Sequence, residues 1–178
     1  DHILFQANIL PAAEDMQFAS AQFPQVYEVS TSGGRPIMFS SMPMEDISFS
    51  ANGKTLLYHD KKGYEDALRK HHTSSITRDI WMCTLNDERG YKKLSTFNGE
   101  DRNPVWGSAD TYYYLSEQNG TFNVFKANIN GGNPTQITKH EKHPVRFLSR
   151  ANNGTLCYGY DGGIYTLKEG GQPQQVNI

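Results

Sequence analysis

The chain has 178 residues, of which 37% are hydrophobic and 12% aromatic, so it is long enough to bury a core and too apolar to be disordered. Its net charge of −2, from 17 basic and 19 acidic residues, gives no electrostatic reason to expect nucleic acid or an anionic membrane as a partner. No apolar run approaches the roughly 18 to 20 residues needed to span a bilayer, and 16 Gly and 8 Pro beside many aromatics favour short strands joined by tight turns.

The first predicted unit, at about residues 1–43, starts inside a strand. We expect this strand, at 3–7, to pair with a second at 25–31, with an irregular insertion at about 9–24 between them. The unit closes with a Gly-Gly-x-Pro turn at 33–36, where Gly supplies positive φ and Pro removes a donor at a strand start. An opening within a strand indicates a trimmed chain, so a missing signal segment says little.

The second unit, at 44–99, is more complete. A strand around 47–49, an Asn-Gly turn and a strand at 55–60 form a short hairpin. An insertion at 61–77 separates this hairpin from a third strand at 79–85. We label the strands of a unit a, b, c and d, so both insertions fall between strands b and c.

The third and fourth units, at 101–142 and 143–178, repeat this order without long insertions. Each again has an apolar strand, a polar turn and a second apolar strand. The b–c pairs expected here are 111–116 with 122–129 and 155–160 with 163–168. The Tyr112-Tyr113-Tyr114 run alternates between the two faces of a strand, which predicts packing between units rather than a stacking platform for bases.

The turn before strand d recurs along the chain. Gly-Gly-x-Pro stands at 33–36, 131–134 and 170–173, and a weaker version, Arg-Gly-Tyr-Lys at 89–92, precedes an expected strand at 93–95. The second glycines are 56, 42 and 39 residues apart. In strand c of each unit, a β-branched residue is followed by an aromatic residue, and these pairs are 54, 44 and 40 residues apart. Two independent markers therefore recur at nearly the same intervals.

Four short strands in a unit of about 40 to 45 residues are typical of a β-propeller blade. We therefore predict an all-β fold in which residues 1–178 form a single propeller segment of about four four-stranded blades. Helical solenoids lack support because no 3.6-residue period is present, and a sandwich has no reason to repeat its turn chemistry. Four blades could close alone, but the truncated start favours a piece of a larger ring, whose open blade edges predict oligomerisation or strand exchange.

Both insertions leave the blades on the same side, and insertions confined to one face often build a binding surface. The candidate contact residues for a peptide or protein are Arg69, Lys70, His71 and His72, beside apolar residues of the first insertion. A solvated loop that only covers a blade edge is the structural alternative. A metal site is disfavoured because adjacent histidines point apart and no HExxH spacing occurs.

No catalytic or cofactor motif is found in the chain. GxSxG, Walker and GxGxxG patterns and clustered Cys and His are all absent from the sequence, so we expect no enzyme activity, no cofactor and no metal, although a dispersed triad leaves no such pattern. Cys83 and Cys157 sit in apolar runs and are interpreted as small buried hydrophobes. His140 and His143 are interpreted as loop residues.

Several runs resemble known propellers. Residues 47–58 are similar to the repeat of TolB-like propellers. Residues 64–81, 99–105 and 143–148 resemble the amino-terminal propeller of tricorn-protease-like serine peptidases, particularly secreted bacterial ones. The polar turns in the third and fourth units depart from the Ser-Pro-Asp-Gly pattern of the family but still suit a turn.

This resemblance implies a six-bladed ring in the parent, followed by further propeller, PDZ and peptidase domains. The catalytic serine and histidine would lie in those other parts. It also implies a periplasmic or secreted location and a propeller that guides or filters peptides.

We therefore expect a non-catalytic propeller domain that handles peptides or docks other domains of its parent chain. The main alternative is a free-standing TolB-like scaffold that binds a protein partner. A third is a hydrolase with its active site at the centre of the ring. Fold alone does not separate these alternatives.

Overall fold

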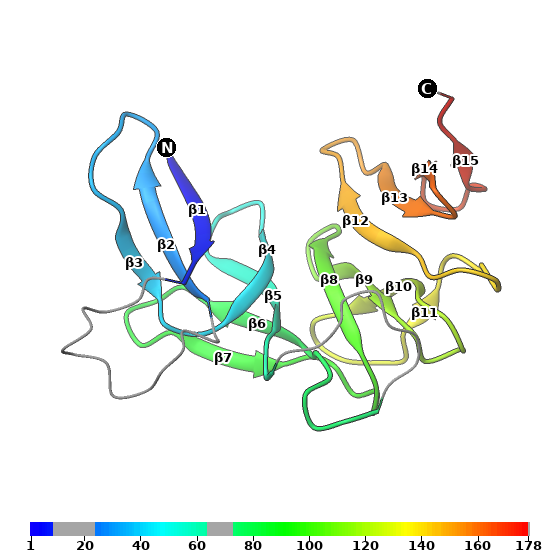
Figure 1. Cartoon of the computed structure of the whole chain (residues 1–178), viewed down its shortest axis with the longest axis horizontal. Helices are drawn as coiled ribbons and strands as arrows, with labels where there is room; N and C mark the ends of the chain where they lie inside the picture. The colour runs from blue at the N-terminus through cyan, green and yellow to red at the C-terminus, as the bar shows by residue number, and fades with distance from the viewer. Residues whose placement is uncertain (9–23, 64–72, 178) are drawn as a thin grey trace.

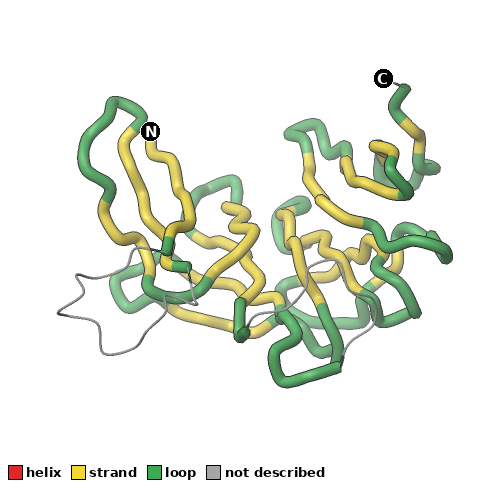
Figure 2. The backbone as a smooth tube through the Cα atoms, viewed as in Figure 1, coloured by secondary structure: helices red, strands yellow, loops and turns green. Residues whose placement is uncertain are grey.

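A computed structural model of the chain describes residues 1–8, 24–63 and 73–177. These residues form four antiparallel sheets and contain no helix (Figure 2). The first sheet has three strands: β1 (His2–Ala7), β2 (Gln25–Ser30) and β3 (Ile37–Ser40). The second has four: β4 (Met44–Phe49), β5 (Thr55–Asp60), β6 (Ile80–Thr84) and β7 (Gly90–Lys93). The third has β8 (Asp101–Trp106), β9 (Thr111–Ser116), β10 (Asn123–Asn128) and β11 (Thr135–Gln136), and the fourth has β12 (Arg146–Arg150), β13 (Leu156–Tyr160), β14 (Gly163–Leu167) and β15 (Gln174–Gln175).

The four sheets follow one another around an arc (Figure 1). Strands β1, β4, β8 and β12 lie on its concave side, and β3, β7, β11 and β15 lie on the outside. Each sheet is therefore a blade, numbered here one to four in chain order. The architecture is a partial all-β propeller, as the repeat predicts, and the first blade lacks strand a.

Local turn chemistry explains the hairpins. In blade two, the amide of Gly53 donates to the Ser50 carbonyl at 2.9 Å, with Gly53 at a φ of 67°. The four expected b–c pairs are all present, as β1–β2, β5–β6, β9–β10 and β13–β14. Short polar turns with a residue that tolerates positive φ thus set the register of each blade.

The core is divided among the contacts between neighbouring blades, which we call seams. Each seam has its own apolar cluster. Tyr112 and Tyr114 pack into the seam between blades two and three, whereas Tyr113 and Leu115 pack into the seam between blades three and four. The alternation expected for the tyrosine run is confirmed, because successive side chains of a strand point to opposite faces.

Two details differ from the sequence prediction. The turn of blade two ends at Arg89, whose amide donates to the Asn86 carbonyl at 3.1 Å, and the last strand already begins at Gly90 instead of 93. This segment lacks the proline that delays strand d in the other blades. Cys83 is fully buried as expected, but Cys157 is only half-buried. It lies on the opposite side of β13 from Leu156, which packs against blade three, so no described blade covers it.

Candidate functional site

The inner strands of blades two, three and four carry the same backbone irregularity. The register of β4, β8 and β12 with the next strand shifts between residues 45 and 48, 102 and 105, and 146 and 149. At each shift one residue has positive φ: Asp46 at 49°, Asn103 at 53° and Phe147 at 57°. Bulges of this kind re-aim side chains and are common beside binding sites. Asp and Asn suit this conformation, whereas a bulky Phe is an outlier.

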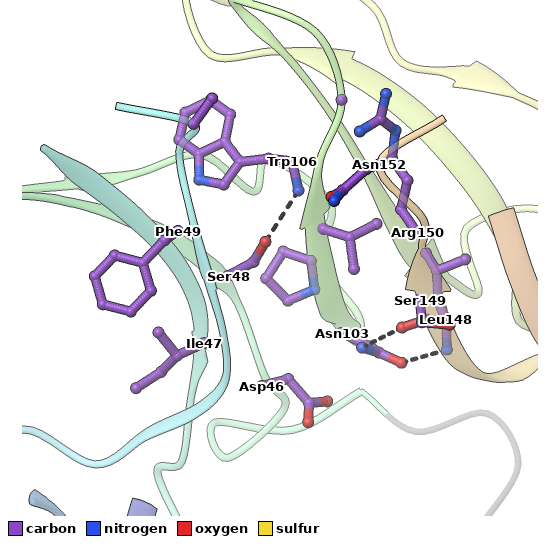
Figure 3. Close-up of a pocket in the computed structure, with 14 residues that line it drawn as sticks. Asp46, Ile47, Ser48, Phe49, Asn103, Trp106, Leu148, Ser149, Arg150 and Asn152 are labelled. Carbon is purple, nitrogen blue, oxygen red and sulfur yellow. Dashed lines mark hydrogen bonds between the residues drawn. The ribbon is translucent and has the colours of Figure 1, made fainter. Parts of the chain in front are cut away.

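A cavity of about 460 Å3 runs along these three inner strands (Figure 3). Its lining comes from residues within 46–51, 103–107 and 148–152. Asp46, Ser149 and Asn152 give this wall polar groups, and Ile47 and Phe49 give it apolar ones. The wall of the concave side is thus hollowed and chemically mixed.

Polar side chains fasten the inner strands to one another. The Asn103 side chain bridges to the next blade: its Nδ2 donates to the Leu148 carbonyl at 3.0 Å and its Oδ1 accepts the Leu148 amide at 2.6 Å. Between blades two and three, the Trp106 amide donates to the Ser48 hydroxyl at 3.1 Å. Figure 3 shows both links along the cavity wall. They satisfy backbone groups of strands that otherwise have a free edge.

His59, at the end of β5, is the buried histidine of this region and is 4% exposed. Its Nδ1 accepts the Asn103 amide at 3.1 Å, so its proton resides on Nε2, which lies 3.2 Å from Glu45 Oε2. The hydrogen bond from His59, with a further contribution from Lys61, lowers the pKa of Glu45 to about 2. Both ring nitrogens of His59 are therefore occupied by structural partners.

Glu45 belongs to a network of charges at the b–c end of the seam between blades two and three. Arg78, 9% exposed, lies with its Nε 3.5 Å from Glu45 and its Nη1 3.1 Å from Glu100. Arg102 lies 3.4 Å from the same Glu100 oxygen, and Lys61 lies 3.2 Å from Glu45. Burial lowers the pKa of Arg102 to about 10. Charges from two blades thus share one partly buried network.

A second charged group holds the described ends of the 61–77 insertion. Lys62 pairs with Asp79 and donates to the Thr77 carbonyl at 2.7 Å. Asp60 accepts the Asp79 amide at 2.8 Å and the Trp81 indole N–H at 3.0 Å. The two ends of the insertion are therefore bound to each other and to strands β5 and β6.

The predicted contact residues Arg69, Lys70, His71 and His72 lie outside the described residues, as does most of the 9–24 insertion. Sequence reasoning assigned no role to His59, Glu45 and Arg78, which belong to no motif. One signal was available. His59 stands where blade three has Leu115 and blade four has Gly159, so it breaks the pattern of the repeat.

His140 and His143 lie in the loop between blades three and four, as expected. The ring of His140 stacks on Tyr160 at 3.8 Å and its Nε2 lies 3.1 Å from the Tyr158 hydroxyl. Burial lowers the pKa of His140. His143 lies 3.3 Å from Asp161. These contacts give both histidines a packing role.

Within the described part of the chain, no three His, Cys, Asp or Glu side chains gather in a way that could hold a metal ion. The same residues include no helix long and apolar enough to cross a membrane.

Comparison with known proteins identifies the repeat. The family model for the tricorn protease N-terminal beta propeller domain matches residues 6–172. No curated protein matches the chain.

Similar solved structures are propellers of several kinds. A TolB from Agrobacterium tumefaciens matches with a TM-score of 0.66 and 16% identity, over 86% of this chain and 56% of that one. TolB from Acinetobacter baumannii matches with a TM-score of 0.63 and 15% identity, over 89% and 39%. A puromycin-hydrolyzing peptidase of Mycobacterium tuberculosis matches with a TM-score of 0.63 and 12% identity, over 98% and 30%. At identities of 12–16%, the likeness shows the fold alone. The chain spans 56% of the length of the first of these structures, 39% of the second and 30% of the third.

Proposed function

The chain belongs to the tricorn protease N-terminal β-propeller family, and from this premise we propose that it is a non-catalytic domain of a tricorn-like serine peptidase. In this proposal the concave wall guides or filters peptides, and other surfaces dock neighbouring domains of the parent chain. Peptide cleavage takes place in the rest of the parent. We extend the proposal to a periplasmic or secreted location, which rests on the resemblance alone and which cell fractionation tests.

The observation that carries this proposal is the cavity along β4, β8 and β12. Its volume of about 460 Å3 lies within the range usual for ligand sites, roughly 300 to 1,000 Å3. The cavity offers an acid at Asp46, a hydroxyl at Ser149, an amide at Asn152 and an aromatic ring at Phe49. An extended peptide has both polar backbone groups and varied side chains, so a mixed wall suits it better than a purely apolar pocket would.

The geometry of His59 supports a non-catalytic role for this region. A histidine beside a carboxylate resembles two members of a hydrolytic triad. A general base needs a free nitrogen directed at the nucleophile. The Nδ1 of His59 instead accepts the Asn103 amide, and its Nε2 faces Glu45. This arrangement disfavours the alternative of a hydrolase centred on His59.

The second candidate function is a free-standing TolB-like scaffold that binds a protein partner. Strand β3 favours it, because Ile37 and Met38 are 58% and 52% exposed on an outer strand. The outer strand of blade two carries Lys92 and Lys93 instead, which is how proteins protect an edge from pairing. An exposed apolar edge suits pairing with a strand of another protein or of a second copy.

Blocking the cavity in the full-length parent tests the proposal. Asn152→Trp places a bulky ring in the cavity, and Asn130→Trp places the same ring on an exposed turn outside it. We expect Asn152→Trp to lower kcat/KM for peptides of ten or more residues by at least about threefold, roughly 0.7 kcal/mol in transition-state free energy, and to spare short chromogenic peptides.

Asn130→Trp should change neither activity. Equal long-peptide activity in both variants, with unchanged stability, would exclude the guiding role. Loss of partner capture on Ile37→Lys, with peptide turnover unaffected, would instead support the scaffold.

A further inference from the structure

Asp101, the first residue of β8, occupies a position that is apolar in the neighbouring blades. Met44 and Val145 stand at the same place, two residues before the positive-φ residue of their strands, and both are fully buried. The backbone confirms the equivalence for blades three and four. The Asp101 amide donates to the Arg78 carbonyl at 3.0 Å, and the Val145 amide donates to the Phe122 carbonyl at 2.9 Å. Asp101 is itself only 2% exposed, so a carboxyl replaces a core side chain.

The Asp101 carboxyl lies among groups that favour its neutral form. Tyr112 and Tyr114 of β9 are its aromatic neighbours, and the pKa of each phenol is raised by burial and by Asp101. Asp79, before β6, and Glu117, after β9, add negative charge nearby. Asp101 Oδ1 has no hydrogen-bond partner among the described residues. An ionised carboxylate would be costly here, because a buried charge needs a partner.

The nearby cations are directed to other acids. Arg78 pairs with Glu45 and Glu100, and Arg102 also pairs with Glu100. Lys62 and Lys93 pair with Asp79. None of the described cations forms a salt bridge with Asp101. The charged groups around Asp101 are therefore paired with one another. The Asp101 carboxyl has no described cation to balance a negative charge, so its neutral, protonated form is favoured.

We propose that Asp101 makes the seam between blades two and three sensitive to pH: the seam is most stable while this carboxyl is protonated and loosens when it ionises. Burial, helped by Asp79 and Glu117 and opposed by hydrogen bonds from Ser116 and Ser95, raises the pKa of Asp101 to about 7. In the unfolded chain the carboxyl ionises at its ordinary value of 3.8. Between these values the folded state binds more protons than the unfolded state, so the free energy of unfolding falls as pH rises from about 4 to about 7.

This inference concerns the seam itself and holds whether or not a peptide binds along the concave wall. Strand β8 belongs both to the seam and to the cavity wall. Loosening of the seam would therefore also move part of the cavity lining and make peptide handling depend on pH.

The test is the melting temperature of the full chain from pH 5 to pH 8, compared with Asp101→Asn. The variant keeps the shape of the side chain and removes its titration. We expect the Tm of the variant minus the Tm of the wild type to increase by at least about 4 °C between pH 5 and pH 8. A carboxyl pKa raised by more than one unit on folding changes the free energy of unfolding by more than about 1.4 kcal/mol across this range. Since both proteins share every histidine, the difference between their curves isolates Asp101.

Two further measurements keep the test decisive if Asp101→Asn folds poorly. Asp101→Met, which installs the residue of blade two, should give the same flattened pH profile. In the wild type, hydrogen exchange corrected for its intrinsic pH dependence should show β6 and β8 opening faster at pH 8 than at pH 6, with β13 and β14 of blade four unchanged. Parallel Tm profiles for wild type and both variants, or equal opening of β6 and β8 at the two pH values, would overturn the proposal.

Discussion

The seam between blades two and three and the seam between blades three and four share a backbone geometry, and each contains an apolar cluster, but their chemistry differs at three equivalent positions. Equivalent positions carry polar residues in the first seam and apolar residues in the second: His59 against Leu115, Arg78 against Phe122, and Asp101 against Val145. The repeat therefore fixes how blades pack, while single substitutions decide what holds each seam together. The seam with the three polar residues, called the polar seam below, is the one beside the described ends of the 61–77 insertion.

The difference has an energetic consequence. Apolar contacts are non-directional and involve no titratable group, so their contribution to stability does not depend on pH. A buried charge network is stable only while each member keeps its partners and its charge state. We therefore expect the two seams to respond differently to the same perturbations, and the following variants are chosen to break that comparison or to sharpen it.

The largest effect is expected in the apolar seam. Leu156, 1% exposed, packs with Leu115 and Tyr158 between blades three and four. Leu156→Ala should lower the free energy of unfolding by about 2–5 kcal/mol, through lost burial and the cavity left behind. Urea unfolding at pH 5 and pH 8 should give the same loss. A loss that changes with pH would mean that the seam is not purely apolar in its energetics.

A smaller effect is expected from the charge network of the other seam. Arg78→Met removes a cation shared by Glu45 and Glu100 and keeps most of the side-chain volume. We expect a loss of about 2 kcal/mol at pH 7, because the partners are partly buried.

The matched control is Lys126→Met, which removes the ion pair of Lys126 in blade three with the exposed Glu169 in blade four. This control should cost less than about 0.5 kcal/mol. Equal losses in urea unfolding of the two variants would show that the buried network contributes no more than a surface pair.

Acid should weaken the polar seam through Glu45. Its lowered pKa means that the carboxylate stabilises the fold above its ordinary value of 4.5, and that this contribution is lost as pH falls toward about 2. Glu45→Gln should abolish that part of the acid dependence, on the order of 1–2 kcal/mol between pH 5 and pH 2.5. Chemical denaturation across this range measures it, and unchanged acid sensitivity in the variant would contradict the assignment.

The smallest effect concerns the bulges. Asn103 and Phe147 share a left-handed backbone, but Phe147 is 79% exposed and has a side chain poorly suited to it. Phe147→Asn should therefore stabilise the isolated chain, by about 0.5–1 kcal/mol. A decrease in stability would show that contact between Phe147 and the Gly159 backbone position outweighs the strain.

The sequence was sufficient to predict the blades because their turns have distinctive residues. Asn-Gly and Gly-Gly-x-Pro turns separate the strands, and the continuous Tyr112–Tyr114 run is typical of a strand buried on both faces. The bulges were not predictable in this way, because Asp46, Asn103 and Phe147 share no residue type. The charge network was missed because its members are distant in sequence, with Glu45 and Arg78 33 positions apart, and meet only when strands pair.

The central claim, that the concave wall handles peptides, is tested most directly by photo-crosslinking in the full-length parent. A peptide of about ten residues carrying a benzophenone side chain would be irradiated with the protein, and the crosslinked fragments mapped by mass spectrometry. We expect crosslinks within 46–51, 103–107 and 148–152, and their loss in Asn152→Trp but not in Asn130→Trp. Crosslinks that fall only on the outer strands β3, β7, β11 and β15, or that persist in Asn152→Trp, would contradict it.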